Sequence, residues 1–186
     1  SSSMDVLKTE LLSKFNFKEL GLAGHPEGNP DISNENIDKA IIEKNSFAKD
    51  TDLKVYLATQ FFFESVSLKN WEKKLDSLNN NLEIHAGIPG PATLKTLVSY
   101  ATSCGISNSI RFLTKQAMNI TKLATTKTPD KLIADLSDYK QINPSSKLTK
   151  LHFYAFGGIK KTSEWLDSIT NSELQINDNN EFKPIN

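Results

Sequence analysis

The sequence has a single cysteine, Cys104, so an internal disulfide is excluded, and one unpaired thiol is usual in a reducing compartment. No apolar run approaches the ~20 residues that a membrane-spanning helix requires. The N-terminus lacks the charged and then apolar pattern of a signal peptide. These absences predict a cytoplasmic protein without a membrane span.

An excess of either charge is also missing. Lysine plus arginine and aspartate plus glutamate number 22 each among 186 residues, which gives a formal net charge of zero. Proteins that bind nucleic acid or anionic membranes usually carry a basic surface, so we expect neither partner. The three histidines, His25, His85 and His152, lie far apart without the spacing of metal ligands, and we expect no metal site.

The chain does contain four short apolar runs that alternate with segments of helical periodicity. Near-continuous apolar runs are typical of buried parallel strands, and alternation with helices predicts an α/β fold with crossover connections. The predicted strands are Leu20–Ala23, a strand within Leu53–Phe63, Leu82–Ile88 and Leu148–Phe156. An open sheet of this kind usually carries a glycine-rich phosphate loop, but neither G-x-G-x-x-G nor GK[ST] occurs.

Helices are predicted between and around the strands. The first covers Met4–Phe15, where apolar residues recur every three or four positions and share one face. Capping residues begin the next ones: Ser33 or Asn34, Ser67 and Thr93. Ser107–Thr125 is expected to be helical in two pieces that include Met118 and Ile120, and Pro129 is expected at the first position of a further helix. The tail from Asn171 is polar and expected to be loose.

Four strands are few for this pattern, because a complete (β/α)₈ barrel needs eight strands and roughly 250 residues. The chain is therefore either a small open α/β sheet or half of a barrel. In both, the chemistry collects at the carboxyl ends of the strands. This rule places the segment from His25 to Asp31, and Gln60, on the candidate functional rim.

Four segments in order resemble the methylenetetrahydrofolate reductase family, a family of flavin-dependent (β/α)₈ barrels. The residues 23–30, AGHPEGNP, are similar to the family's AGYPEGHP after the fifth strand, and TQFFF at 59–63 matches the segment after the sixth. EIHAGI at 83–88 is similar to EIIPGI on the seventh strand, and LHFY at 151–154 to FHFYT on the eighth. The resemblance extends to about Leu166, so it implies the C-terminal half of a TIM barrel over residues 1–170, followed by a polar tail at 171–186.

The resemblance implies an oxidoreductase of one-carbon metabolism. Such an enzyme moves a hydride from NADH or NADPH through FAD to 5,10-methylenetetrahydrofolate and forms 5-methyltetrahydrofolate. The glutamate that protonates the folate lies in the family's first strand, in an FEFFPP segment that does not occur here. We therefore expect no catalytic residue in this chain and incomplete activity for it alone.

Residue by residue, the resemblance implies two groups of binding positions. Gln60 and Tyr100 would bind folate, with Gln60 also meeting the nicotinamide, and Thr96 stands where a second folate-contacting glutamine is common. The positions that would hold the adenine, ribose and phosphates of FAD are His25, Asn29, Asp31, Asp38 and Lys44. Lysine suits a phosphate as a mobile point charge.

Each of these residues also has a structural alternative. Gln60 could bond to loop backbone, Tyr100 could be a core residue of its helix, and Asp38 and Lys44 could lie on a solvated helix face. His85 and His152 are most simply hydrogen-bonded core residues, although His152 could point into a barrel. Cys104 is most simply a buried thiol.

The sequence departs from the family at several of these positions. The family has Tyr at His25, His at Asn29, and often Asn-Arg at Gly157-Gly158, where the arginine can meet the folate's glutamate tail. Lys160 or Lys161 could replace that cation. A non-catalytic alternative is a half-barrel that pairs with a separate N-terminal half or with itself, because its edge strands would need covering. A folate-binding barrel with different chemistry is a further alternative.

Overall fold

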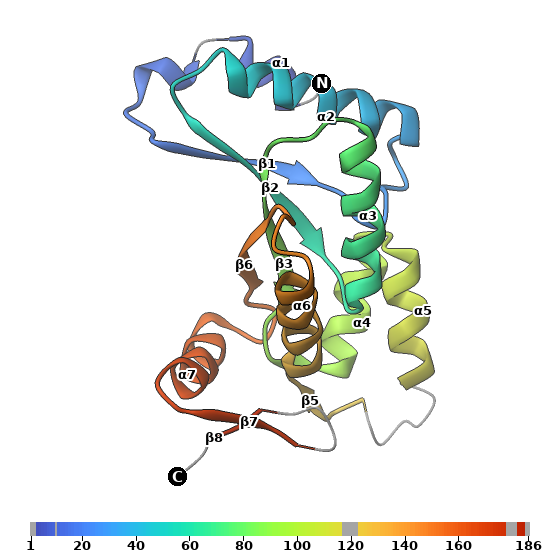
Figure 1. Ribbon diagram of the computed structural model, residues 1–186. Helices are drawn as coiled ribbons and strands as arrows, with labels where there is room; N and C mark the ends of the chain where they lie inside the picture. Colours follow the sequence, from blue (N-terminus) through green and yellow to red (C-terminus); the bar gives the residue numbers. More distant parts are fainter. Residues whose placement is uncertain (1–2, 10, 117–122, 178–181, 185–186) are drawn as a thin grey trace. The chain divides into compact units, whose positions relative to one another are not determined.

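The computed structural model describes residues 3–9, 11–116, 123–177 and 182–184 (Figure 1). The chain divides into two compact units, and each is described by itself below. The first unit comprises Ser1–Gln60, Val66–Ala86 and Ser146–His152, and the second comprises Phe61–Ser65, Gly87–Ser145 and Phe153–Asn186.

The main sheet has four parallel strands in the order β1-β2-β3-β6. Their bounds are Glu19–Gly24 for β1, Lys54–Phe61 for β2, Glu83–Pro89 for β3 and Leu148–Tyr154 for β6. The four predicted strands are therefore confirmed, as is the α/β class, because each lies within a residue or two of its apolar run. The register of β1 and β2 runs from Glu19 opposite Lys54 to Gly24 opposite Thr59.

The first unit contains α1 (Ser3–Leu7), the 3₁₀-helix η1 (Leu11–Lys14), α2 (Asn34–Lys49) and most of α3 (Ser65–Ser77). Ser33 caps α2 as predicted, since its hydroxyl accepts a hydrogen bond from the amide of Asn36 at 3.3 Å. The cap predicted at Ser67 is wrong, because α3 begins at Ser65. Buried side chains from the strands and helices form the core of this unit: Leu22, Ile37, Ile41, Val55, Leu57, Leu68, Leu75 and Ile84.

The N-terminal helix is shorter than predicted. Instead of one helix over Met4–Phe15, the chain forms α1 and, after a break, η1. Met4 is buried and α1 contacts α2, yet Val6, Leu11 and Phe15 are 49% to 62% exposed. The predicted apolar face therefore exists in the sequence but has little to pack against, and a short helix gains most of its stability from such packing.

The second unit is largely helical. It contains α4 (Leu94–Ser103), α5 (Ser107–Gln116), α6 (Asp130–Ile142) and α7 (Ile159–Thr170), with a two-stranded antiparallel pair of β4 (Ala92–Thr93) and β5 (Thr126–Lys127). Thr93 caps α4 as predicted. Pro129 is the N-cap of α6, one position earlier than predicted. Met118 and Ile120 lie outside the described residues.

The polar tail also contains structure that the sequence did not predict. Leu174–Ile176 (β7) and Phe182–Pro184 (β8) pair as antiparallel strands. The amide of Phe182 donates to the buried Asp130 carboxylate at 3.2 Å, which attaches the pair to the start of α6. Of the helices that the structure describes, none is both long enough and apolar enough to cross a lipid bilayer.

Candidate functional site

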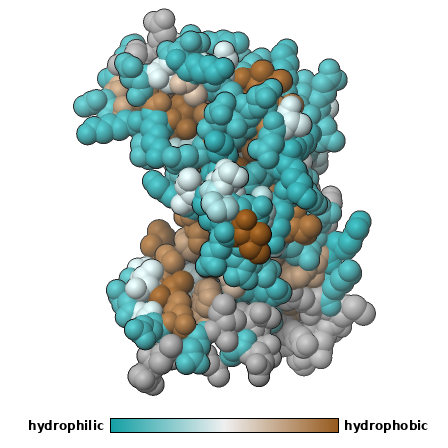
Figure 2. All heavy atoms as spheres, viewed as in Figure 1, coloured by the Kyte–Doolittle hydropathy of each residue, from teal (hydrophilic) through white to brown (hydrophobic). Residues whose placement is uncertain are grey.

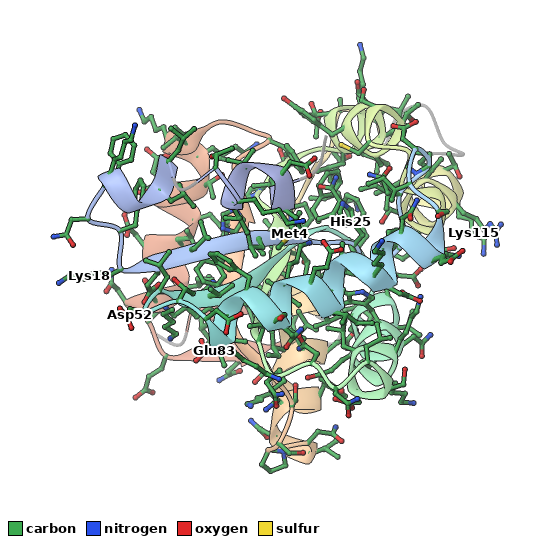
Figure 3. All side chains as sticks on the ribbon, turned by 90° about the horizontal axis from the view of Figure 1, so that it is seen from above. Met4, Lys18, His25, Asp52, Glu83 and Lys115 are labelled. Carbon is green, nitrogen blue, oxygen red and sulfur yellow. The ribbon has the colours of Figure 1, made fainter. Side chains whose placement is uncertain are left out.

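The candidate site of the first unit lies at the carboxyl end of β1. Figure 3 labels Lys18 and His25 at the two ends of this strand, with Asp52 and Glu83 near the starts of β2 and β3 on the side of Lys18. His25 directly follows Gly24, and Gln60 directly follows Thr59, the paired residue on β2. The register therefore places His25, just after β1, at the same level as Gln60, the second-last residue of β2.

The end of β1 is packed closely on α3. A Cβ atom added to Gly24 would lie 2.6 Å from Cη2 of Trp71, whose side chain is buried. Only glycine therefore lets the strand approach the indole ring this closely. The contact fixes the point from which the His25 loop leaves the sheet.

Lys44 is the most unusual residue of the site. It is 4% exposed, and its Nζ donates a hydrogen bond to the carbonyl oxygen of Ala23 at 2.7 Å. Among the described residues it makes no ion pair, and burial lowers the pKa of its ammonium group. A buried ammonium without a counter-charge is costly, so an anion bound at this point would be stabilising.

The charge of the Lys44 ammonium acts on the neighbouring side chain of His25. Its side chain is half-buried, and burial together with the Lys44 ammonium lowers the pKa of its imidazole. At neutral pH the ring is accordingly uncharged, with one nitrogen able to donate a hydrogen bond and the other able to accept one. The combination is a buried cation beside a neutral hydrogen-bonding ring.

The loop after His25 is held by its own polar contacts. Ser67 donates its hydroxyl hydrogen to Oε1 of Glu27 at 3.0 Å, which ties the loop to the first turn of α3. Asn29 Oδ1 accepts from the amide of Asp31 at 2.9 Å, the local turn that asparagine favours. Gly28 adopts a φ of 78°, a left-handed conformation that glycine tolerates.

The five residues predicted to hold FAD therefore occupy different situations. His25 and Lys44 lie together at the end of β1. Asn29 uses its side chain within the loop, and Asp31 is exposed. Asp38, on α2, forms an ion pair with Lys74 of α3, so its carboxylate is already engaged. The alternative of a solvated helix face is wrong for Lys44, which is buried.

The residues predicted to meet folate fall in both units. Gln60, half-buried, is the second-last residue of β2 in the first unit, and Tyr100 and Thr96 lie on α4 in the second. Tyr100 is 44% exposed, and its ring stacks on that of Phe156 with centroids 4.2 Å apart. The Thr96 amide donates to the Thr93 hydroxyl at 3.2 Å, and the two hydroxyls are 2.9 Å apart, so Thr96 takes part in the cap of α4.

The glycine pair after β6 has a steric basis within the second unit. A Cβ atom on Gly157 would lie 1.9 Å from the carbonyl oxygen of Pro91, so no other residue fits there without backbone movement. Gly158 has open space around it but a φ of 102°. Lys161 donates to the Thr126 hydroxyl at 2.8 Å, and Lys160 lies 3.8 Å from Glu164.

The remaining histidines do not join the site. His85 is buried and stacks on Tyr56 with ring centroids 3.8 Å apart. Its Nε2 makes no hydrogen bond to the described residues, so the prediction of a hydrogen-bonded core histidine is only half right. His152 is exposed on β6 rather than buried. In the part of the chain that is described, no three histidine, cysteine or acidic side chains are grouped to hold a metal ion.

No model of a known protein family matches this chain. The candidate site is therefore argued from the contacts of its residues, and some of these contacts were not predicted from the sequence. The acceptor for Lys44 is a backbone carbonyl, and Trp71 and Ser67 come from a helix more than 35 residues further along. Within the AGHPEG segment, Gly24 and Glu27 could have indicated this packing, because Gly24 packs against Trp71 and Glu27 accepts a hydrogen bond from Ser67.

Proposed function

We propose that this chain is the flavin-binding part of an oxidoreductase that resembles methylenetetrahydrofolate reductase. The observation that carries the proposal is the buried ammonium of Lys44, which has no carboxylate partner among the described residues and stands at the carboxyl end of a parallel strand. Ligands of open α/β sheets and of barrels bind at this end of the strands. A dinucleotide would supply the missing negative charge through its phosphates.

In this proposal, residues of the first unit bind different parts of the ligands. Lys44 neutralises phosphate charge, and His25 hydrogen-bonds the ribose or phosphate oxygens as a neutral ring. Gln60, level with His25 on the next strand, offers both an amide donor and an amide acceptor to the edge of a pterin or nicotinamide ring. FAD, when bound, supplies the hydride transfer between NADH or NADPH and the folate. Asp38 has no direct role, because Lys74 holds its carboxylate.

The second unit supports the folate side of the proposal. Tyr100 presents an exposed ring that is held in place by stacking on Phe156, and such a surface suits a flat heterocycle. Gly157 and Gly158 remove the cation that the family often uses for the glutamate tail of folate. Lys160 is then the more available substitute, because its side chain is 90% exposed and its ion pair with Glu164 is long, at 3.8 Å, whereas Lys161 donates to the Thr126 hydroxyl.

The four parallel strands with intervening helices support the finer proposal of a (β/α)₈ barrel, of which this chain supplies four strands. The acid glutamate expected from the resemblance would then come from the other four. On this proposal the chain binds FAD and does not complete the reaction by itself. The test should therefore measure FAD binding to this chain and not catalytic turnover.

The test measures FAD, ADP and riboflavin binding to the purified chain by titration calorimetry. The variants are Lys44→Gln and, as a matched control, Lys39→Gln, which removes the same charge from an exposed position on the same helix. We expect FAD and ADP to bind the wild type and the control, and to lose more than about tenfold in affinity in Lys44→Gln, since a charge-assisted bond to phosphate is removed. Equal affinity of Lys44→Gln, or binding of riboflavin as tight as that of FAD, would contradict the proposal.

A further inference from the structure

Ser67, in the first turn of α3, contacts the loop that carries His25. The surface that Figure 2 shows over α2 and α3 is mainly hydrophilic, but Ser67 is only 8% exposed. Its hydroxyl does not cap the helix, because α3 begins at Ser65. It donates instead to Oε1 of Glu27 at 3.0 Å, and this is the one hydrogen bond of its side chain to the described residues. The contact therefore fixes where the Glu27 carboxylate lies.

A short segment of chain separates this carboxylate from the buried cation of the candidate site. Glu27 is four residues past Ala23, whose carbonyl oxygen holds the Lys44 ammonium. Four residues span at most about 14 Å when extended. The turn closed by the Gly28 amide on the His25 carbonyl oxygen, at 3.1 Å, shortens this path. Yet Lys44 forms no ion pair with the described residues, and burial is what lowers its pKa. The carboxylate is therefore held away from Lys44.

Two positions compete for the Glu27 carboxylate. On α3 it accepts from Ser67 near the amino end of the helix, where the helix dipole favours negative charge. At Lys44 it would neutralise a buried ammonium that has no counter-charge among the described residues, which would relieve the cost of burying that charge. The dipole alone is a weak attraction at a half-exposed position, so the Ser67 hydroxyl decides between the two.

We propose that Ser67 is a positioning residue, which holds Glu27 on α3 and so keeps the Lys44 ammonium available to the phosphates of a nucleotide. This inference rests on the proposed function, because it takes Lys44 as the residue that binds phosphate. Glu27 is the internal competitor, since a carboxylate and a phosphate are both anions and exclude each other at one ammonium. Ser67 thus acts on ligand affinity through Glu27 and Lys44, without touching the ligand.

Titration calorimetry with ADP tests the inference on Ser67→Ala, Glu27→Gln and the double variant. Ser67→Ala should weaken ADP binding by about tenfold, because the released carboxylate pairs with Lys44. Glu27→Gln keeps an oxygen that accepts from Ser67 but has no charge, so it should bind ADP at least as tightly as the wild type. The double variant should regain most of the lost affinity, because no carboxylate is left to compete. Ser77→Ala is the matched control, since Ser77 is exposed at the end of the same helix and donates to the Lys74 carbonyl oxygen.

Rescue in the double variant distinguishes competition from a merely structural role of the Ser67–Glu27 bond. If the bond only held the loop in shape, removing both partners would leave ADP binding as weak as in Ser67→Ala. That result, or wild-type affinity in Ser67→Ala, would overturn the inference. Circular dichroism checks that the variants fold.

NMR titration of the Lys44 side chain without ligand separates this inference from the proposed function. Ser67→Ala should raise the pKa of Lys44, because a carboxylate beside the ammonium favours its charged form, and adding Glu27→Gln should reverse the rise. A wild type that binds no ADP but shows this pattern would refute the proposed function and leave the positioning of Glu27 by Ser67 supported. A Lys44 pKa that is the same in Ser67→Ala and the wild type would refute the positioning.

Discussion

Replacement of Lys44 by methionine should stabilise the ligand-free protein, although it removes a hydrogen bond. Methionine has nearly the length of lysine and no charge, so it fills the same space between α2 and β1. Lys44 is 4% exposed, and its ammonium makes one hydrogen bond to the described residues, to the Ala23 carbonyl oxygen at 2.7 Å. Its burial therefore leaves most of its lost hydration unreplaced.

The magnitude follows from two opposing effects. Removing the buried charge recovers a desolvation penalty of several kcal/mol. Against this, the variant loses a charged hydrogen bond worth about 1.5–3 kcal/mol. We therefore expect Lys44→Met to raise the free energy of unfolding at neutral pH by about 1–2 kcal/mol.

The pH dependence gives a second signature. Burial lowers the pKa of Lys44 below its ordinary value, so between the folded and the unfolded pKa the unfolded chain binds more protons. The wild type should therefore gain stability as pH rises through this alkaline range, and Lys44→Met should lack this gain. The advantage of the variant is accordingly largest near neutrality and shrinks at alkaline pH.

The assay is urea unfolding of the wild type, Lys44→Met and Lys39→Met at neutral and alkaline pH, with and without ADP. Lys39→Met should leave stability close to that of the wild type, because Lys39 is exposed on the same helix. ADP should stabilise the wild type but not Lys44→Met. A destabilised Lys44→Met at neutral pH would refute the argument, because it would mean that the hydrogen bond outweighs the buried charge.

Four further substitutions test other contacts. Burial lowers the pKa of both His85 and His25, so the free energy of unfolding should be highest above the unfolded pKa of about 6.5 and should fall as the solution becomes more acidic. His85→Phe keeps a ring stacked on Tyr56, and it should reduce this pH dependence of the urea midpoint. Gly157→Ala should cost about 2–4 kcal/mol because its Cβ meets the Pro91 carbonyl oxygen, whereas Gly158→Ala should cost only about 1 kcal/mol through its φ of 102°; comparable losses in thermal unfolding would contradict this. Glu72→Leu should cost about 3 kcal/mol, since the buried carboxylate accepts hydrogen bonds from Ser146 and Lys147, and an unchanged melting temperature would count against it.

The strands were predictable because their signal is local. Each apolar run ends at a glycine, proline or polar residue, and the observed strands end within about two residues of the predicted points. The caps at Ser33 and Thr93 were predictable for the same reason. A serine or threonine just before a segment of helical periodicity is visible in the sequence, and its hydroxyl accepts from the amide three residues later. The cap predicted at Ser67 is wrong, because α3 begins two residues earlier, at Ser65, and the Ser67 hydroxyl donates to Glu27, 40 positions earlier.

The state of the candidate site was less accessible from the sequence. The resemblance pointed to His25 and Lys44, and the structure places them together. It could not indicate that Lys44 is buried on a backbone carbonyl, or that Asp38 is paired with Lys74. Those facts depend on how α2 and α3 pack on the strands, and neither helix carries a local signal for it.

The N-terminal segment also shows that a local sequence pattern does not determine burial. Its spacing of apolar residues predicts a helix with a buried face, and the spacing is real, but Val6, Leu11 and Phe15 remain exposed. Helical periodicity reports which residues share a face and says nothing about whether that face finds a partner within the chain. The contrast between pattern and exposure is therefore a reason to look for a partner outside it.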